Sequence, residues 1–355
     1  FLTPRLGCMY IDFHRLTETD HAMILLYRDR PFAAELLAVA ILHLDLFTWL
    51  GERDGADLQT ICDHFALKTR PADVMLTLAV ANGYLQRHTD GHLEVTQLAI
   101  EHLTARSPWY LGPYYEPLRG NNAYMGFLQV LQTDRPANWQ AKQDTDNWHD
   151  AMTQTAFAES FTALMHSRGL ALGQHLAKSL QIAGILQGGL LLDVAGGSGI
   201  YSACLLSTAP QLKAVVLEQP PVDQIAQREM SRFGLDHRCE VLSGDMFQAN
   251  WPRCQVLLLS NVLHDWDIPE IRMLLQKASS ALEPGGWLVV HEAFLGEEKD
   301  GPLPVAEYSA LLMHITQGRC YAPNEIRTAA EGLPLAWKEF QPTIADRGWL
   351  AAQRT

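Results

Sequence analysis

The second half of the chain is constrained by short aliphatic runs that alternate with helix-length amphipathic segments. After Gly188 and Gly189 these runs occupy residues 190–194, 214–217, 239–242, 256–259 and 287–290. Continuous aliphatic strands separated by helices are typical of a parallel sheet that is covered on both faces. The sequence therefore predicts an α/β domain over residues 186–355, with further strand candidates at 337–340 and 348–352 that could close the sheet edge.

The first half of the chain is mostly helical in its periodicity. Helix-length segments at 57–65 and 70–82 are followed by strand candidates at 84–87 and 92–95 around a tight turn. This succession is the outline of a winged helix. Residues 1–115 carry 9 Lys and Arg against 14 Asp and Glu, whereas DNA-binding modules concentrate positive charge. We therefore expect a winged-helix dimerisation domain over 1–115 and a helical connector over 116–185.

The composition restricts the partners. The 355 residues include 27 Lys and Arg against 40 Asp and Glu, so the net charge of −13 disfavours nucleic acids and anionic membranes as partners. Six cysteines without a CxxC pair favour free thiols in a reducing compartment, and we expect a cytoplasmic protein. No membrane span is predicted, because the most apolar stretch, 32–47, is interrupted by charged residues. A ligand-sensing winged-helix regulator is an alternative that the acidic N-terminal part disfavours.

A glycine-rich turn follows the first predicted strand. Residues 190–194, which include Asp193, run into Gly196, Gly197 and Gly199 before a helix begins. Glycines let the backbone approach a ligand closely, and the helix N-terminus offers unpaired N–H groups. A dinucleotide fingerprint would carry a third glycine where this chain has Ser202. The turn therefore predicts a small polar ligand without a pyrophosphate.

Carboxylates follow the next two strands. Glu218 comes 19 residues after Gly199, where it could accept hydrogen bonds from both hydroxyls of a ribose. Asp245 could accept from an exocyclic amine, while Met246 and Phe247 offer soft and aromatic surface to a purine. Ligands of open α/β sheets bind at the carboxyl ends of the strands. An adenosine without a pyrophosphate indicates S-adenosylmethionine (SAM).

A histidine at the end of the fourth strand is the candidate general base. The imidazole of His264 has an unperturbed pKa of about 6.5, which leaves it largely neutral near pH 7 and able to accept a proton. Glu292 ends the fifth strand, which we expect to neighbour the fourth. Its carboxylate could therefore hold the His264 ring in one tautomer and stabilise the cationic form.

Together these motifs resemble those of the class I SAM-dependent methyltransferases of the caffeate and hydroxyindole O-methyltransferase type, with their bacterial natural-product relatives. The resemblance covers essentially the whole chain. It implies a Rossmann-like SAM-binding domain, methyl transfer to a small-molecule hydroxyl, and a homodimer whose N-terminal domain contributes to the partner's acceptor pocket. The motifs are residues 193–199, Leu217-Glu218-Gln219-Pro220, Gly244-Asp245-Met246-Phe247, Leu263-His264-Asp265-Trp266, Glu283-Pro284-Gly285-Gly286 and Ser107-Pro108-Trp109-Tyr110-Leu111-Gly112.

The resemblance also implies residue roles. His264 would deprotonate the acceptor and Glu292 would steady it. The expected cofactor-binding residues are Asp193, Gly196, Gly197, Gly199, Glu218, Gln219, Asp245, Met246, Phe247, Ser260, Asn261 and Trp266. The residues expected around an aromatic acceptor are Phe157, Phe161, Met165, His314 and Cys320. Where plant members usually carry a lysine and a second orienting glutamate, this chain has Ser260 and Cys320.

Other chemistries on the same fold stay open at this point. The chain could methylate carbon or nitrogen, since Cys320 departs from the plant pattern. Metal-assisted methylation of a 2-oxo acid would need one ion to reach both His264 and His314, because divalent metals accept neutral imidazoles. We predict no metal site, because His314 can equally line the acceptor pocket.

Overall fold

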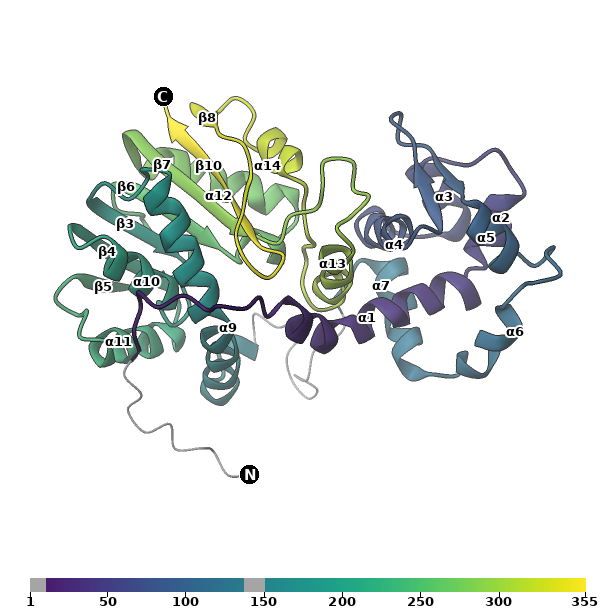
Figure 1. The fold of residues 1–355 in the computed structure, drawn as a ribbon, viewed down its shortest axis with the longest axis horizontal. Helices are drawn as coiled ribbons and strands as arrows, with labels where there is room; N and C mark the ends of the chain where they lie inside the picture. Colours follow the sequence, from purple (N-terminus) through teal and green to yellow (C-terminus); the bar gives the residue numbers. More distant parts are fainter. Residues whose placement is uncertain (1–10, 137–150) are drawn as a thin grey trace.

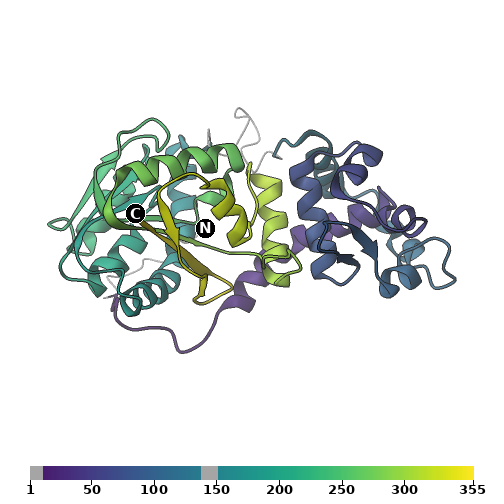
Figure 2. The same cartoon turned by 90° about the horizontal axis from the view of Figure 1, so that it is seen from above.

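The computed structural model describes residues 11–136 and 151–355. A helical lobe built from the first part of the chain lies beside an α/β lobe built from the second half (Figure 1), and the view from above shows the same two lobes (Figure 2). The helical lobe contains α1 (Ala22–Leu42), α2 (Leu46–Gly51), α3 (Leu58–Phe65), α4 (Thr69–Ala81), β1 (Leu85–Arg87), β2 (Leu93–Val95), α5 (Gln97–His102), α6 (Gly112–Tyr115), η1 (Glu116–Leu118) and α7 (Asn122–Thr133).

Local signals in the sequence account for the short elements of the helical lobe. The Asp57 side chain accepts a hydrogen bond from the backbone N–H of Thr60 at 2.7 Å, which satisfies a free donor at the start of α3. Strands β1 and β2 pair in antiparallel register, with Leu85 opposite Val95. The order of helix, helix and hairpin is the one that the sequence predicts. Its assignment as a winged helix stays a prediction.

The α/β lobe is built on one mixed sheet. Its strands lie in the order β5-β4-β3-β6-β7-β10-β8, and β9 pairs with β10. The pairs from β5 to β7 are parallel, whereas β10 is antiparallel to its neighbours. All five predicted strands of the parallel part are therefore confirmed. The strands are β3 (Gly189–Val194), β4 (Leu212–Glu218), β5 (Cys239–Ser243), β6 (Cys254–Ser260), β7 (Leu282–Glu292), β8 (Leu335–Trp337), β9 (Gln341–Pro342) and β10 (Gly348–Arg354).

One edge strand lies earlier than predicted. The sequence places it at residues 337–340, but β8 pairs with β10 from Leu335 to Trp337. Phe340 leaves the ladder and packs its ring edge-on against Phe294, with the centroids 5.4 Å apart. The aromatic contact, rather than sheet pairing, therefore determines where Phe340 lies.

Helices cover both faces of the sheet. Alternate strand residues such as Leu191 pack with α9 (Thr155–Ile182), α10 (Ile200–Thr208) and α11 (Val222–Arg232). The residues between them, such as Leu192, pack with α12 (Ile268–Ala281) and α14 (Pro323–Ala329). Helix α9 confirms the predicted helix for the part of 144–186 that the structure describes. Strand order reverses direction between β3 and β6, and ligands of such sheets bind at this switch point.

Each lobe packs against a segment that comes from the other half of the chain. Helix α13 (Leu303–Ile315) follows β7 in the chain, yet its side chains belong to the same hydrophobic core as α1 and α4. In the other direction, Phe13 packs edge-on against Phe233 of the α/β lobe, with the ring centroids 5.2 Å apart. The boundaries predicted at 115 and 185 stay a prediction, and the packing joins residues from both sides of them.

Within the residues that the structure describes, no helix has the length and apolar character needed to cross a membrane.

Candidate active site

The buried carboxylate of Asp193 lies against the glycine turn that follows β3. Asp193 accepts a hydrogen bond from the Ser202 hydroxyl at 2.7 Å, and burial raises the pKa of Asp193 to about 7. A Cβ atom on Gly196 would lie 2.8 Å from the Asp193 carboxyl, so only glycine allows this close approach. Gly197 has a φ of +58°, which also favours glycine. The chain thus folds tightly here and exposes its backbone to the space above the sheet.

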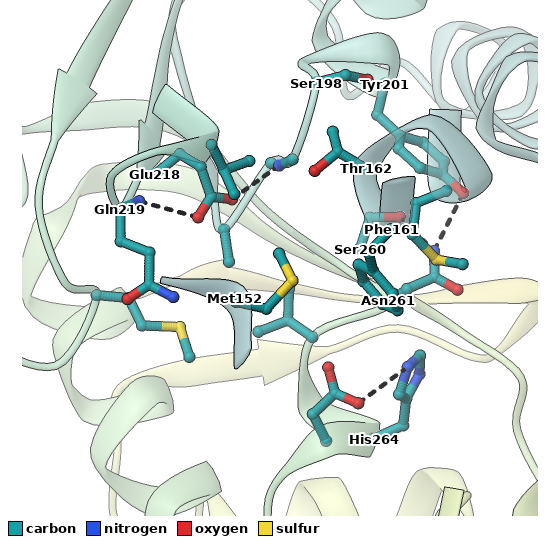
Figure 3. Close-up of a pocket in the computed structure, with 18 of the residues that line it drawn as sticks. Met152, Phe161, Thr162, Ser198, Tyr201, Glu218, Gln219, Ser260, Asn261 and His264 are labelled. Carbon is teal, nitrogen blue, oxygen red and sulfur yellow. Dashed lines mark hydrogen bonds and ion pairs between the residues drawn. The ribbon is translucent and has the colours of Figure 1, made fainter. Parts of the chain in front are cut away.

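Glu218 faces the turn from the end of β4. Its Oε2 accepts from the backbone N–H of Gly197 and its Oε1 from that of Gln219, both at 2.9 Å (Figure 3). Burial raises the pKa of Glu218 to about 7. Each carboxylate oxygen uses one lone pair in these bonds and keeps another for a ligand hydroxyl. The residues present therefore fit a ribose at this position.

The loop after β5 offers an acidic and an aromatic surface. Asp245 accepts from the backbone N–H groups of Phe247 at 2.6 Å and Gln248 at 3.2 Å, which fixes the loop. The Phe247 ring meets Trp266 edge-on, with the centroids 4.7 Å apart. Met246 lines the same cavity, so these side chains form a slot that fits a planar purine.

His264 and Glu292 are brought together at the ends of β6 and β7. The Nδ1 atom of His264 shares a hydrogen bond with Oε2 of Glu292. The other oxygen of Glu292 accepts from the backbone N–H groups of Val262 and Leu263, at 2.9 and 3.0 Å. These three hydrogen bonds of Glu292 all hold the loop that carries His264. The predicted contact between Glu292 and His264 is present. Nε2 of His264 lies 3.6 Å from Asp265, and both residues line the cavity.

The surroundings of His264 favour its protonated form. Burial by itself lowers the pKa of an imidazole, but Glu292, Tyr308 and Asp265 outweigh it and raise the pKa of His264 to about 9. Burial likewise raises the pKa of Asp265, to about 6. The cofactor-free site therefore holds an imidazolium near pH 7, which must lose its proton before Nε2 can act as a base.

One cavity unites most of the predicted site residues. Met152, Phe161, Glu218 and His264 surround it in Figure 3. The predicted residues that line it are Asp193, Gly196, Gly197, Glu218, Gln219, Asp245, Met246, Phe247, Ser260, Asn261, His264, Trp266, Phe161 and Met165. Glu292 lies behind His264, and Gly199 begins α10, where an added Cβ would meet Met230 at 2.7 Å. Gly199 therefore serves helix packing rather than the cavity wall.

Three residues predicted for the acceptor pocket do not line this cavity. Phe157 stacks on Phe161 at a centroid distance of 6.2 Å and lies one helical turn away from the wall. Cys320 is fully buried, and its backbone N–H donates to Ser309 at 3.1 Å. His314 packs against Phe127 of the helical lobe, at 4.2 Å between ring centroids. The face of α13 that carries His314 is turned toward the helical lobe. These three residues therefore do not line the cavity, and their part in binding an acceptor stays a prediction.

The metal-bridged alternative finds no support among the described residues. The cavity wall includes His264 but not His314. Burial lowers the pKa of His314 to about 4, as expected for an imidazole in an apolar core. Within residues 11–136 and 151–355, no cluster of three or more His, Cys, Asp or Glu is arranged to hold a metal ion.

The sequence reasoning missed several residues of the wall. They are Arg28, Met152, Thr162, His166, Arg168, Ser198, Tyr201, Val222, Tyr308, Leu311, Leu312, Ile315 and Thr316. Helical spacing could have found Arg168, because it continues the face of Phe161 and Met165 at the next turn of α9. Within the wall, Asn261 donates to the Tyr201 hydroxyl at 3.0 Å (Figure 3). The Ser260 hydroxyl pairs with Nδ1 of His291 at 2.9 Å.

Comparisons with known proteins agree with this geometry. The O-methyltransferase domain family matches residues 128–333. An O-methyltransferase family 2 protein from Planctomyces limnophilus, solved in complex with apigenin, has a TM-score of 0.85 and 30% identity over 97% of this chain and 99% of that chain. The 3-hydroxy-5-methyl-1-naphthoate 3-O-methyltransferase of Streptomyces sahachiroi is 27% identical over 81% of both chains.

Human N-acetylserotonin methyltransferase, solved in complex with SAM, shares the fold, with a TM-score of 0.57 and 20% identity over 96% of this chain and 99% of that chain. The family match spans more than half of the chain, and the fold similarity extends over nearly all of it. The chain belongs to the O-methyltransferase domain family and is a SAM-dependent methyltransferase.

Proposed function

We propose that the chain methylates a hydroxyl oxygen of an aromatic small molecule, with His264 as the general base. The observation that carries this proposal is the His264–Glu292 pair in one cavity with the glycine turn and Glu218. In this arrangement the imidazole would lie next to the methyl group of the bound cofactor. A carboxylate-oriented imidazole is a suitable base for removing a hydroxyl proton.

The roles within the pair follow from its hydrogen bonds. Glu292 would hold the Nδ1 proton of His264, which leaves the Nε2 lone pair of the neutral ring free to accept the proton of the acceptor. As the acceptor oxygen forms its bond to the methyl carbon, its proton passes to Nε2. SAM, when bound, supplies an electrophilic methyl group and leaves as S-adenosylhomocysteine (SAH). A phenol of pKa about 10 is a weak nucleophile before deprotonation, and general-base assistance is typically worth about 10² to 10⁴ in rate.

The remaining predicted cofactor residues are assigned by chemistry. Glu218 would bind the ribose hydroxyls, Asp245 the adenine amine, and Met246 with Phe247 the faces of the purine. Gly196 and Gly197 would approach the methionine part of SAM. The free lone pairs on Glu218 and the ordered loop at Asp245 support these assignments.

An aromatic acceptor is supported by the apolar side of the cavity. Met152, Phe161, Met165, Leu311 and Ile315 line it. Such a wall favours a flat, apolar body that carries few polar groups. The relatives described above are named for aromatic compounds or bind one: a naphthoate, N-acetylserotonin and apigenin.

We further propose that the helical lobe is a winged-helix dimerisation domain. Several large apolar side chains of this lobe are exposed in the single chain: Leu98, Ile100, Trp109, Leu111, Tyr114, Leu118 and Met125. A second copy of the chain that covered them would remove this apolar surface from water. Light scattering should give the mass of a homodimer, and a monomer at micromolar concentration would contradict the proposed dimerisation.

Five buried free cysteines support the cytoplasmic location expected from the sequence.

The test of the proposed reaction is methyl transfer from isotope-labelled SAM to a panel of phenols and naphthols. We expect label in an O-methyl group, located by NMR of the product. Binding of SAH, followed by calorimetry, serves as the control that the cofactor site is intact. Tight SAH binding with label only on carbon or nitrogen would overturn the assignment of an oxygen acceptor.

A further inference from the structure

Arg168 is a partly buried cation in the cavity wall, and its hydrogen-bond partners are all neutral. Its guanidinium donates to the Tyr308 hydroxyl at 3.2 Å, to Asn261 Oδ1 at 3.3 Å and to the sulfur of Met165 at 3.3 Å. Its Nε–H has no hydrogen-bond partner. Among the residues that the structure describes, no carboxylate lies within 4.0 Å of the Arg168 guanidinium. A guanidinium that is partly withdrawn from water and has no anion beside it is unfavourable, so this wall is suited to receiving an anion.

Further arginines near Arg168 add positive charge to this end of the cavity. Arg28 also lines the cavity, and the guanidinium of Arg347 lies 4.5 Å from the centre of the Tyr308 ring. The facing acidic groups are Asp29, which is paired with Arg28, and Asp265, which lies beside His264. Burial raises the pKa of both carboxyl groups. Neither carboxylate bonds to Arg168.

The position of Arg168 relates it to the reacting atoms. Tyr308, which accepts from Arg168, lies edge-on to the His264 ring with 5.9 Å between the centroids. On α9, Phe161, Met165 and Arg168 follow one another at helical spacing along the cavity. An aromatic ring placed on Phe161 and Met165 would therefore have a cation at one edge and the imidazole nearby.

We propose that Arg168 determines acceptor specificity by binding a carboxylate carried by the same aromatic molecule as the methylated hydroxyl. This inference rests on the proposed function for the aromatic hydroxyl only. The guanidinium, which lines the cavity, would donate charge-assisted hydrogen bonds to this carboxylate. The methionine carboxylate of SAM has the same chemistry, and the experiment distinguishes the two sources.

The experiment measures binding to the enzyme saturated with SAH, so it does not depend on turnover. Calorimetry compares 3-hydroxy-2-naphthoate with its methyl ester, which has the same ring and hydroxyl but no charge. We expect the acid to bind about 10- to 100-fold more tightly than the ester. Arg168→Gln should abolish this preference, and Arg168→Lys should retain part of it. Arg272→Gln, on the exposed surface of α12, is the matched control and should leave it unchanged.

Several outcomes would overturn the inference. They are equal binding of acid and ester by the unmodified enzyme, an unchanged preference in both Arg168 variants, or a loss of SAH affinity in these variants instead of the acid preference. The last result would assign Arg168 to the methionine carboxylate. If Arg168→Gln does not fold, the comparison in the unmodified enzyme and in Arg168→Lys still decides. Arg168-dependent binding of the acid without any methyl transfer would leave this inference intact and contradict the proposed reaction.

Discussion

The acid limb of the pH–rate profile should report the pKa of about 9 at His264. The protonated imidazole has no lone pair on Nε2, so only the neutral fraction can act as a base. With a pKa of about 9, that fraction is about 3% at pH 7.5, and kcat/KM should rise about tenfold per pH unit until it levels off near pH 9. An unperturbed histidine would instead level off near pH 6.5.

Replacing Glu292 with Gln tests the cause of this shift. Loss of the charge removes the main stabilisation of the imidazolium, so the limb should move down toward pH 6.5. The plateau should fall at the same time. The oxygen of the introduced amide can still accept from the N–H groups of Val262 and Leu263, which directs the amide N–H toward Nδ1. The ring then carries its proton on Nε2, and a wrong tautomer costs about 10² to 10⁴ in kcat.

The assay is kcat/KM for methyl transfer between pH 6 and 10, with SAH calorimetry to confirm that the site is folded. Glu283→Gln, an exposed carboxylate on the same strand, is the control and should leave the profile unchanged. Repeating the profile with a more acidic phenol separates the ionisation of the acceptor from that of the enzyme. Retention by Glu292→Gln of both the plateau and a limb near pH 9 would refute the assignment of the limb to a His264–Glu292 pair.

Four further changes have defined outcomes. Glu218→Gln should weaken SAH binding about 10- to 100-fold by calorimetry, because a hydrogen bond to a charged group is worth about 1.5–3 kcal/mol. Gly196→Ala should lower the melting temperature and SAH affinity, since its Cβ would lie 2.8 Å from a carboxyl group, whereas Gly120→Ala meets nothing within 4 Å and should not. The pKa of His314 is about 4 in the folded state and about 6.5 in the unfolded state, so the free energy of unfolding should fall as the pH drops from 6.5 toward 4. His314→Leu should lose less of this free energy between pH 7.5 and pH 5.0, as measured by urea unfolding at both pH values. Cys320→Ala should cost about 1–2 kcal/mol of stability and leave the pH limb in place, and a shifted limb would show that the thiol takes part.

The contact between His264 and Glu292 was predictable from the order of the parallel strands. Aliphatic runs identify β6 and β7 as buried strands, and neighbouring parallel strands end at the same edge. Their register places Ser260 beside His291, so the residues that follow, His264 and Glu292, lie within reach of each other. Local sequence and strand order are sufficient for that step.

The acceptor side was less predictable because it depends on which face of a helix meets which lobe. Helix α13 is apolar on nearly all sides, so its periodicity does not distinguish the face with Tyr308 and Leu311 from the face with His314. Only the packing of α13 against α1 and α4 decides this. Arg168 was missed for a related reason, since an arginine at the end of an apolar stripe is ordinarily interpreted as a solvent-exposed residue.

Among the residues that the structure describes, Glu292 is the carboxylate that bonds to Nδ1 of His264. Plant relatives usually carry a second orienting carboxylate where this chain has Cys320, but the Cys320 side chain is fully buried. Burial raises the pKa of its thiol to about 12, so the sulfur is neutral at working pH and cannot stabilise an imidazolium as a carboxylate would. Nδ1 of His264 therefore depends on Glu292, and Asp265 lies on the opposite, Nε2 side. No second carboxylate among the described residues bonds to Nδ1 and could replace Glu292 there. We therefore expect the single substitution Glu292→Gln to change both the tautomer and the pKa of His264.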